Sequence, residues 1–350
     1  MFSRGIISPY VSLLPVVCLL VSSLWVTESG VEQSKFGLLQ VNSTVPTPLK
    51  FIRSFSSADD VTKELYPVLD RSLDIIAGPA DPHSSIDKLQ APYAVTTDSK
   101  HRVIVTDPKA GIVHIFDFEH SRYATMGGRG SRLRSPTGVA VDSDDNIYLS
   151  DPAADGILVY SPGGRFLHSL GKMGDESYFQ GPVGIAVHTP TGHIYVCDSR
   201  RHMVLQLDRK GHILGHFGKR WGGKGPGDFR YPSQLAIAGD ELFVLDRGNS
   251  RLQILDLNGH FRREISLPEV SFDAGLALDH SKNIYISDGQ FNVVNVFTFE
   301  GQPLFKYGHA GAKPGEFDAP SGLWIDSANK LYVTDTKNRR IQLFQIGTQP

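Results

Sequence analysis

Cysteine is almost absent from this chain: its 350 residues include two, Cys18 and Cys197. Cys18 lies in an apolar run near the N-terminus, and removal of that run would leave one cysteine and no intramolecular disulfide bond. Cys197 stands alone in the apolar segment HIYVCDS. We interpret Cys197 as a small buried hydrophobic side chain, with a reactive thiol as the alternative.

The chain also lacks an excess of charge of either sign. Its 35 lysines and arginines nearly balance its 37 aspartates and glutamates, for a formal net charge of −2. A dedicated nucleic-acid-binding protein normally carries a basic excess, so the composition argues against that class and leaves room only for a local basic face. Glycine and proline are plentiful instead, with 35 and 21 residues spread along the chain, which indicates many turns and many short strands.

The N-terminus has the pattern of an export signal. Arg4 precedes the apolar stretch Tyr10–Val26, which has signal-peptide length, and Pro15 weakens this stretch as a membrane-spanning helix of about 20 apolar residues. We therefore interpret residues 1–29 as a signal peptide or N-terminal anchor and residues 30–48 as a flexible tether. The protein is expected outside the cytoplasm, either secreted or periplasmic, or tethered to the membrane by an uncleaved leader.

The strongest signal is an internal repeat that fills residues 89–350. Each unit has an apolar first strand, an apolar second strand closed by aspartate, an apolar third strand and, in most units, a more polar fourth strand. The second strands read RVIVTD, NIYLSD, HIYVCD, ELFVLD, NIYISD and KLYVTD. Their closing aspartates, spaced 42 to 48 residues apart, are Asp107, Asp151, Asp198, Asp246, Asp288 and Asp335. Four short strands in about 45 residues are typical of a propeller blade.

The sequence therefore predicts an all-β fold, a six-bladed β-propeller, with blades near residues 89–128, 133–172, 179–219, 229–269, 272–309 and 317–350. The sixth unit ends after its third strand, and Leu49–Ser57 (LKFIRSFSS) resembles the fourth strands elsewhere. We expect this segment to complete blade six and close the ring. Residues 49–88 should also contain a short helix, capped by Ser57 and Asp60. The apolar stripe of this helix would be Val61, Leu65, Leu69, Leu73 and Ile76.

With these motifs the sequence resembles the NHL-repeat family, in particular exported bacterial NHL proteins with an N-terminal extension. The best units are PSGLWIDSANKLYVTDTKNRRIQLF (Pro320–Phe344) and PTGVAVDSDDNIYLSD (Pro136–Asp151), and the resemblance extends from about Leu49 to Gly347. The family's Asn-x-Arg before the third strand survives only in blades four and six, as Asn249/Arg251 and Asn338/Arg340. Blade four also has Gln234 where most units have glycine. These departures do not affect the predicted fold. They argue against a function that requires every repeat to be regular.

The repeated aspartates are interpreted as structural, because a residue present once per blade usually holds the turn of that blade. Aspartate at a strand end accepts hydrogen bonds from backbone N–H groups two or three residues further on. A second set precedes the tight turns between the first and second strands and receives the same interpretation: Asp98, Asp142, Asp279 and Asp326.

Catalysis finds little support. The resemblance implies that amidating lyases of this fold bind metal through histidines near the channel, and that lactonase-type propellers hold a divalent ion with acidic and amide residues. The corresponding first-strand residues here offer one carboxylate and no histidine: Tyr93, Thr137, Val183, Ser233, Gln234, Asp273 and Ser321. The sequence also has no Gly-x-Ser-x-Gly motif. We expect no catalytic residue, metal or cofactor, and keep a metal-dependent lyase or lactonase as the alternative.

The loops between the second and third strands are better candidates. In a propeller they share one face with the start of each first strand, and only Asp155 opposes their positive charge. Their basic residues are Lys109, Arg200, Arg201, His202, Arg247, Lys337 and Arg339. Trp221, in the connector GKRWGGKGPG, either folds back onto its blade or anchors a partner. Trp324, within GLWID, is expected in the core.

We hypothesise that this basic rim binds a protein or an anionic ligand, so that the protein is a monomeric, non-catalytic binding scaffold. Solvated loops without a partner are the simpler alternative. The leader argues against nucleic acid as the ligand, and membrane contact is expected only through the N-terminal segment.

Overall fold

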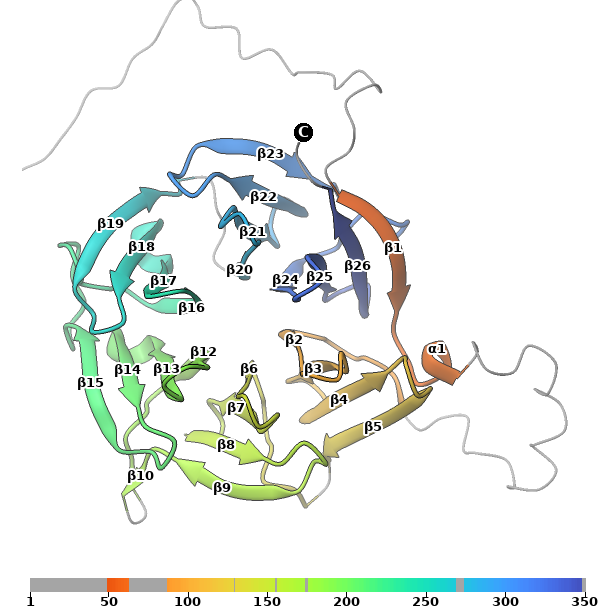
Figure 1. The fold of residues 1–350 in the computed structure, drawn as a ribbon, viewed down its shortest axis with the longest axis horizontal. Coiled ribbons are helices and arrows are strands. Elements are labelled where there is room, and N and C mark those ends of the chain that lie inside the picture. The colour runs from red at the N-terminus through yellow and green to blue at the C-terminus, as the bar shows by residue number, and fades with distance from the viewer. Residues whose placement is uncertain are drawn as a thin grey trace, which may run out of the picture. The chain divides into compact units, whose positions relative to one another are not determined.

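The computed structural model of the protein describes residues 49–62, 87–128, 130–154, 156–173, 176–268 and 274–347. The expected leader and tether, most of the expected helix, and Asp155 and Asp273 lie outside these residues. Six antiparallel four-stranded sheets follow one another around a ring, so the predicted six-bladed β-propeller is confirmed (Figure 1). Each sheet is one blade, and its first strand lies nearest the centre of the ring.

The first three blades follow each other directly along the chain. Blade one contains β2 (Val95–Thr97), β3 (Val103–Asp107), β4 (Ile112–Asp117) and β5 (Arg122–Gly127). Blade two contains β6 (Gly138–Val141), β7 (Ile147–Asp151), β8 (Gly156–Tyr160) and β9 (Phe166–Leu170). A small hairpin of β10 (Lys172–Met173) and β11 (Glu176–Ser177) leads to blade three. This blade contains β12 (Pro182–His188), β13 (His193–Asp198), β14 (Met203–Leu207) and β15 (Ile213–Gly218), with the 3-10 turn η2 (Ser199–Arg201) after β13.

The other three blades complete the ring. Blade four contains β16 (Pro232–Ala238), β17 (Glu241–Asp246), β18 (Arg251–Asp256) and β19 (Phe261–Ser266), with the 3-10 turn η3 (Arg247–Asn249) after β17. Blade five contains β20 (Leu276–Leu278), β21 (Ile284–Asp288), β22 (Val293–Phe297) and β23 (Pro303–Tyr307). Blade six contains β24 (Pro320–Ile325), β25 (Lys330–Asp335), β26 (Arg340–Ile346) and β1 (Leu49–Phe55).

Burial along the strands follows their place in the blade. The second strands β3, β7 and β21 are buried at every residue, because neighbouring blades cover both of their faces. Outer strands such as β19 alternate between buried and exposed residues, since only one face is covered. The hydrophobic core therefore lies between blades rather than in one central mass.

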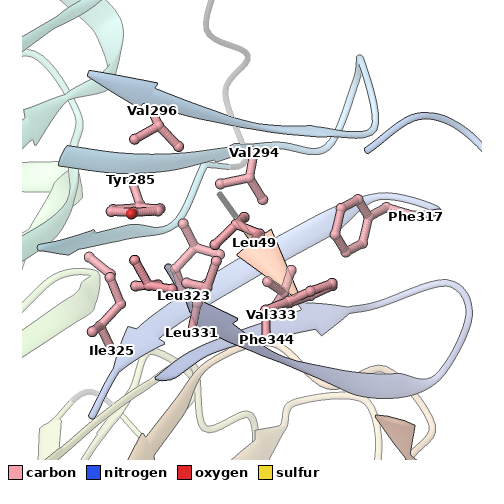
Figure 2. Close-up of a cluster of buried hydrophobic side chains, with 12 residues drawn as sticks. Leu49, Tyr285, Val294, Val296, Phe317, Leu323, Ile325, Leu331, Val333 and Phe344 are labelled. Carbon is pink, nitrogen blue, oxygen red and sulfur yellow. The ribbon is translucent and has the colours of Figure 1, made fainter. Parts of the chain in front are cut away.

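The contact between blades five and six illustrates this core. Figure 2 shows Tyr285 and Val294 of blade five facing Leu331 and Phe344 of blade six. Leu49, from the other end of the sequence, is buried in the same cluster. The packing of blade six therefore depends on residues that lie almost 300 positions apart in the chain.

The ring closes through β1, which pairs antiparallel with β26 as the outer strand of blade six (Figure 1). The register runs from Leu49 opposite Ile346 to Phe55 opposite Ile341, with an irregularity between Phe51 and Arg53. Leu49 and Phe55 are both buried. The expected closing strand is thus present, and it leaves blade six with the same four strands as the other blades.

Hydroxyl groups add polar contacts between blades. Thr334 precedes the closing aspartate of blade six, and its hydroxyl donates to the carbonyl oxygen of Tyr93 in blade one at 3.0 Å. The hydroxyl of Ser321 donates to the same oxygen at 3.0 Å. Thr106 occupies the position of Thr334 in blade one and donates to the carbonyl of Thr137 in blade two. In blade three this position is Cys197, which is free and fully buried, and burial raises the pKa of its thiol.

The expected short helix begins but is described only as α1 (Asp59–Thr62). The carboxylate of Asp60 accepts hydrogen bonds from the backbone N–H groups of Ser56 at 2.7 Å and Ser57 at 3.0 Å. This is the reciprocal half of the expected capping box. Val61 is buried, and the rest of the predicted apolar stripe lies outside the described residues. In the part of the chain that is described, no helix has the length and apolarity to cross a membrane.

Closure predicts different outcomes for two N-terminal deletions. Removal of residues 1–47 should leave the melting temperature nearly unchanged, because β1 remains. Removal of residues 1–57 should expose the edge of β26 and the cluster around Phe344, and so lower the melting temperature and promote aggregation. Thermal unfolding and sedimentation of the two variants check this. Equal melting temperatures and solubility would contradict it.

Candidate functional site

The turns and connectors of the propeller divide between two faces. In each antiparallel blade, the turn from the second to the third strand lies at the same end as the connector to the next blade. We call this end the connector face. The turns between first and second strands and between third and fourth strands form the opposite face. All the candidate binding residues predicted from the sequence lie in turns or connectors of the connector face.

The closing aspartates join the turns of the connector face to the connectors that precede each blade. Asp107 accepts hydrogen bonds from the backbone N–H of Ala91, in the segment that precedes blade one, at 3.1 Å, and from Ala110, in its own turn, at 3.1 Å. In five blades the described donors include backbone N–H groups 16 to 18 residues upstream of the aspartate. All six carboxylates are inaccessible to solvent. The structural interpretation therefore fits, although local turn donors are only part of it.

The charge on these aspartates depends on their donors. Burial opposes the charge of Asp107, but the His114 side chain and several backbone N–H groups outweigh it and lower the pKa of Asp107. Burial raises the pKa of Asp198, and the backbone N–H groups and Arg201 that stabilise its charge do not compensate fully. The Nε atom of Arg201 lies 3.7 Å from the Asp198 carboxylate. Arg201 is therefore partly engaged in holding its own blade.

The second set of aspartates lies in the turns of the opposite face. Asp142 accepts hydrogen bonds from the backbone N–H groups of Asp144 and Asn146, both at 2.9 Å, and from the Tyr148 hydroxyl at 3.0 Å. Burial and the nearby Asp142 carboxylate raise the pKa of Tyr148. Asp98, Asp279 and Asp326 accept equivalent backbone hydrogen bonds in their own turns. These residues stabilise turns, as expected.

A denser arrangement, which we call the connector clamp, holds the glycine-rich connector before blade four. It consists of Asn249, Arg251 and Gln253, which follow Asp246 in the chain and lie two positions apart from one another. Arg251 donates through Nε to the Asp246 carboxylate at 2.8 Å and through its terminal nitrogens to the carbonyls of Lys224, Gly225 and Asp228. Asn249 donates to the carbonyl of Gly223 at 2.8 Å, and Gln253 donates to that of Asp228 at 2.6 Å.

Blade six repeats this clamp with Asn338, Arg340 and Gln342. Arg340 donates to the Asp335 carboxylate at 2.7 Å and to the carbonyls of Ala312, Lys313 and Glu316. Asn338 donates to the carbonyl of Gly311 at 2.8 Å. The Asn-x-Arg motif therefore holds the glycine-rich connectors that precede blades four and six.

The seven candidate basic residues differ in their accessibility. The side chains of Lys109, Arg200, Lys337 and Arg339 are exposed. Arg201, His202 and Arg247 are partly buried. His202 accepts a hydrogen bond at Nδ1 from the backbone N–H of Tyr231 at 3.0 Å and packs edge-on against the Tyr231 ring. The exposed cations therefore come from blades one, three and six, whereas the partly buried ones help to hold the connector face.

The structure decides between the two alternatives for Trp221 and corrects the expectation for Trp324. Trp221 is 89% exposed, so it does not fold back onto its blade. Trp324 is not a core residue: its side chain is 36% exposed, and its Nε1 donates to the hydroxyl of Thr97 at 2.9 Å. The corresponding first-strand residues are small in the other blades. An alignment of the six first strands would therefore have indicated that this position does not hold a large core side chain.

Trp324 lines a cavity of about 250 Å³ that is bounded by the first strands of all six blades. Glycines such as Gly138 let neighbouring first strands approach closely, because a Cβ there would collide with the carbonyl of Val183. The lining is mainly aliphatic, and its polar side chains are Thr96, Thr189 and Gln234. In the described parts of the chain, no three His, Cys, Asp or Glu side chains gather where they could hold a metal ion.

Comparison with known proteins agrees with this architecture. Residues 179–207 match the NHL repeat family. The chain is 30% identical over 236 aligned residues to the peptidylglycine alpha-amidating monooxygenase of Rattus norvegicus. The match covers 60% of this chain and 23% of that protein. It is 32% identical over 102 residues to the human NHL repeat-containing protein 3, covering 28% of this chain and 29% of that protein. The chain thus spans only about a quarter of the length of these relatives.

Solved structures show the same fold. A streptogramin B lyase superposes with a TM-score of 0.55 at 15% identity, covering 74% of this chain and 94% of that chain. A gluconolactonase from Xanthomonas campestris superposes with a TM-score of 0.57 at 16% identity, covering 74% and 88%. At these identities the likeness concerns the fold alone. The protein is a six-bladed β-propeller in which residues 179–207, in blade three, match the NHL repeat.

The connector clamp predicts unequal effects for two arginines of blade four. Arg251→Ala should lower the free energy of unfolding by about 3 kcal/mol, because it removes the side-chain donor of the Lys224 and Gly225 carbonyls and one of the donors of the buried Asp246 carboxylate. It should also speed tryptic cleavage after Lys224. Arg262→Ala, which removes the surface ion pairs of Arg262 with Asp240 and Glu241, should cost less than about 1 kcal/mol. Urea unfolding and limited proteolysis check this, and equal effects of the two variants would contradict it.

Proposed function

We propose that this protein is a non-catalytic scaffold that binds a protein or an anionic ligand through its connector face, as a monomer outside the cytoplasm. One observation carries the proposal. The turns between second and third strands contain six lysines and arginines and one acidic residue, Asp155. Because the whole chain carries a net charge of −2, this positive charge is a property of one face and not of the composition.

The accessibility of these cations supports a binding role. In the described part of the chain, the side chains of Lys109, Arg200 and Arg339 make no ion pair or hydrogen bond. Lys337 has only a contact of 3.6 Å with the exposed Asp318. The opposite face differs, since the turn at Asp142 adds two further acidic residues. An acidic partner is therefore attracted to the connector face and not to the opposite face.

A metal-dependent lyase or lactonase is the second candidate. The named relatives and neighbours of this fold, together with the cavity beside Trp324, favour it. The donor set does not fit well: the described cavity lining offers the hydroxyls of Thr96 and Thr189 and the amide of Gln234, without imidazole or carboxylate. We therefore place no reaction step in this cavity.

Metal analysis separates the two candidates. We expect the full-length protein, purified and dialysed against metal-free buffer, to contain substoichiometric zinc, calcium, iron and manganese by plasma mass spectrometry. The reason is that an oxygen-poor, imidazole-free lining binds these ions weakly. A stoichiometric ion that survives dialysis would favour the enzyme candidate.

The charge of the connector face is tested with two triple variants that change net charge equally. The first, Lys109→Ser, Arg200→Ser and Lys337→Ser, removes exposed cations from the connector face. The control, Lys100→Ser, Arg165→Ser and Lys210→Ser, removes exposed cations from the opposite face. Each substitution should change stability by less than about 0.5 kcal/mol, since all six side chains are exposed.

For the first triple variant, association with poly-L-glutamate should slow about tenfold at low salt, whereas the control should stay near wild type. The difference should shrink at physiological ionic strength, where screening acts beyond about 8 Å. Stopped-flow or surface-plasmon measurements across a salt series give these rates. Equal slowing of both variants would mean that only net charge matters, and it would overturn the proposed binding face.

A further inference from the structure

The connector before blade four presents one tryptophan to solvent on a firmly held loop. Trp221 lies inside a turn in which the backbone N–H of Gly222 donates to the carbonyl of Lys219 at 2.8 Å. The loop is closed on its far side by the backbone N–H of Gly223, which donates to the carbonyl of Phe229 at 3.1 Å. The connector clamp and the ion pair between Lys219 and Asp228 at 2.9 Å fix it further. The backbone that carries the exposed indole is thus held in place before any partner arrives.

The tryptophan is not needed for this loop to form. In the connector before blade six, Gly311 donates to the carbonyl of Phe317 at 3.0 Å and accepts from Asn338, the same bonds that Gly223 makes. Counted from the equivalent glycines Gly218 and Gly308, which lie against Phe229 and Phe317, the connector before blade four has four residues, 219–222, where that before blade six has two, 309–310. The longer connector therefore carries Arg220 and Trp221 as an addition to a complete structure.

One cation lies beside this indole, and others lie in the same connector. The guanidinium of Arg220 lies 5.7 Å from the Trp221 ring centre. Lys224 and Arg230 are exposed in the same connector, and in the described part of the chain neither Arg220 nor Lys224 makes an ion pair or a side-chain hydrogen bond. A ligand that binds this loop must therefore present negative charge next to a surface that packs on an aromatic ring.

We propose that the occupant is an acidic polysaccharide, one of whose sugar rings stacks on Trp221 while its carboxylate or sulfate groups bind Arg220 and Lys224. This rests on the proposed function of the connector face and names its ligand class. Insertion of the indole into a protein pocket or a lipid layer would also desolvate the neighbouring Arg220, which is costly. Stacking on a sugar leaves Arg220 at the surface, beside an anionic group. The cations of the other turns lie around the same face, where a long polyanion reaches them.

The test uses the full-length protein, a heparin-derived decasaccharide and poly-L-glutamate of similar charge. Trp221→Ala should weaken decasaccharide binding about tenfold, the size expected for loss of one aromatic stacking contact of about 1.4 kcal/mol. It should change poly-L-glutamate binding less than twofold. Phe291→Ala is the matched control, because Phe291 is also an exposed aromatic residue of the connector face, in blade five. This control should leave both affinities unchanged.

The other results overturn the proposal in distinguishable ways. Equal losses for poly-L-glutamate on Trp221→Ala would indicate an acidic polypeptide as the occupant. Binding to phosphatidylcholine vesicles with phosphatidylserine that depends on Trp221, without saccharide binding, would indicate a membrane surface. If the connector-face triple variant weakens saccharide binding and Trp221→Ala does not, the binding face holds and the stacking role fails. If wild-type protein binds none of these anions, both the ligand class and the proposed function fail.

Discussion

A carboxylate without access to water must be surrounded by donors, and six such carboxylates organise this propeller. Each closing aspartate stands at the end of a second strand. In the five blades where these donors are described, backbone N–H groups of the incoming connector reach it. The third strand, the turn and the preceding connector are therefore tied at one point. Loss of one carboxylate would leave several buried donors unpaired, which explains why the residue recurs in every blade.

The same constraint shapes the candidate binding face. Because the aspartates fix where each connector arrives, the turns beside them are held in place, and the exposed side chains of Lys109, Arg200 and Arg339 make no ion pair or hydrogen bond in the described part of the chain. Blades four and six reinforce this with the connector clamp, whose arginine satisfies three carbonyls of a glycine-rich segment in each case. Glycine-rich segments ordinarily lose much conformational entropy on ordering. Here the hydrogen bonds of a single arginine offset part of that cost and hold the connector that carries Trp221.

Two kinds of closure complete the ring. The strand β1 supplies the apolar contacts of blade six through Leu49 and Phe55, whereas Ser321 and Thr334 supply polar contacts to the carbonyl of Tyr93 in blade one. The apolar contacts contribute most of the stability, and the hydroxyl contacts set how the first strands sit against each other. A central cavity remains where the first strands meet, lined by aliphatic side chains and Trp324.

The sequence by itself determined the number of blades, the closing aspartates, the closing strand and the loops that carry the basic residues. Each of these predictions follows from the period of the repeat or from the spacing of residues within it. Because the repeat occurs six times, one irregular copy does not hide the pattern. Only the tertiary structure decided which of those basic residues are accessible, that Trp221 is exposed, and that Trp324 faces a cavity. The reason is that Arg201 and Arg200 are adjacent in the chain and of one type, yet only one lies next to the Asp198 carboxylate. Contacts between segments far apart in sequence settle such differences, and no local pattern records them.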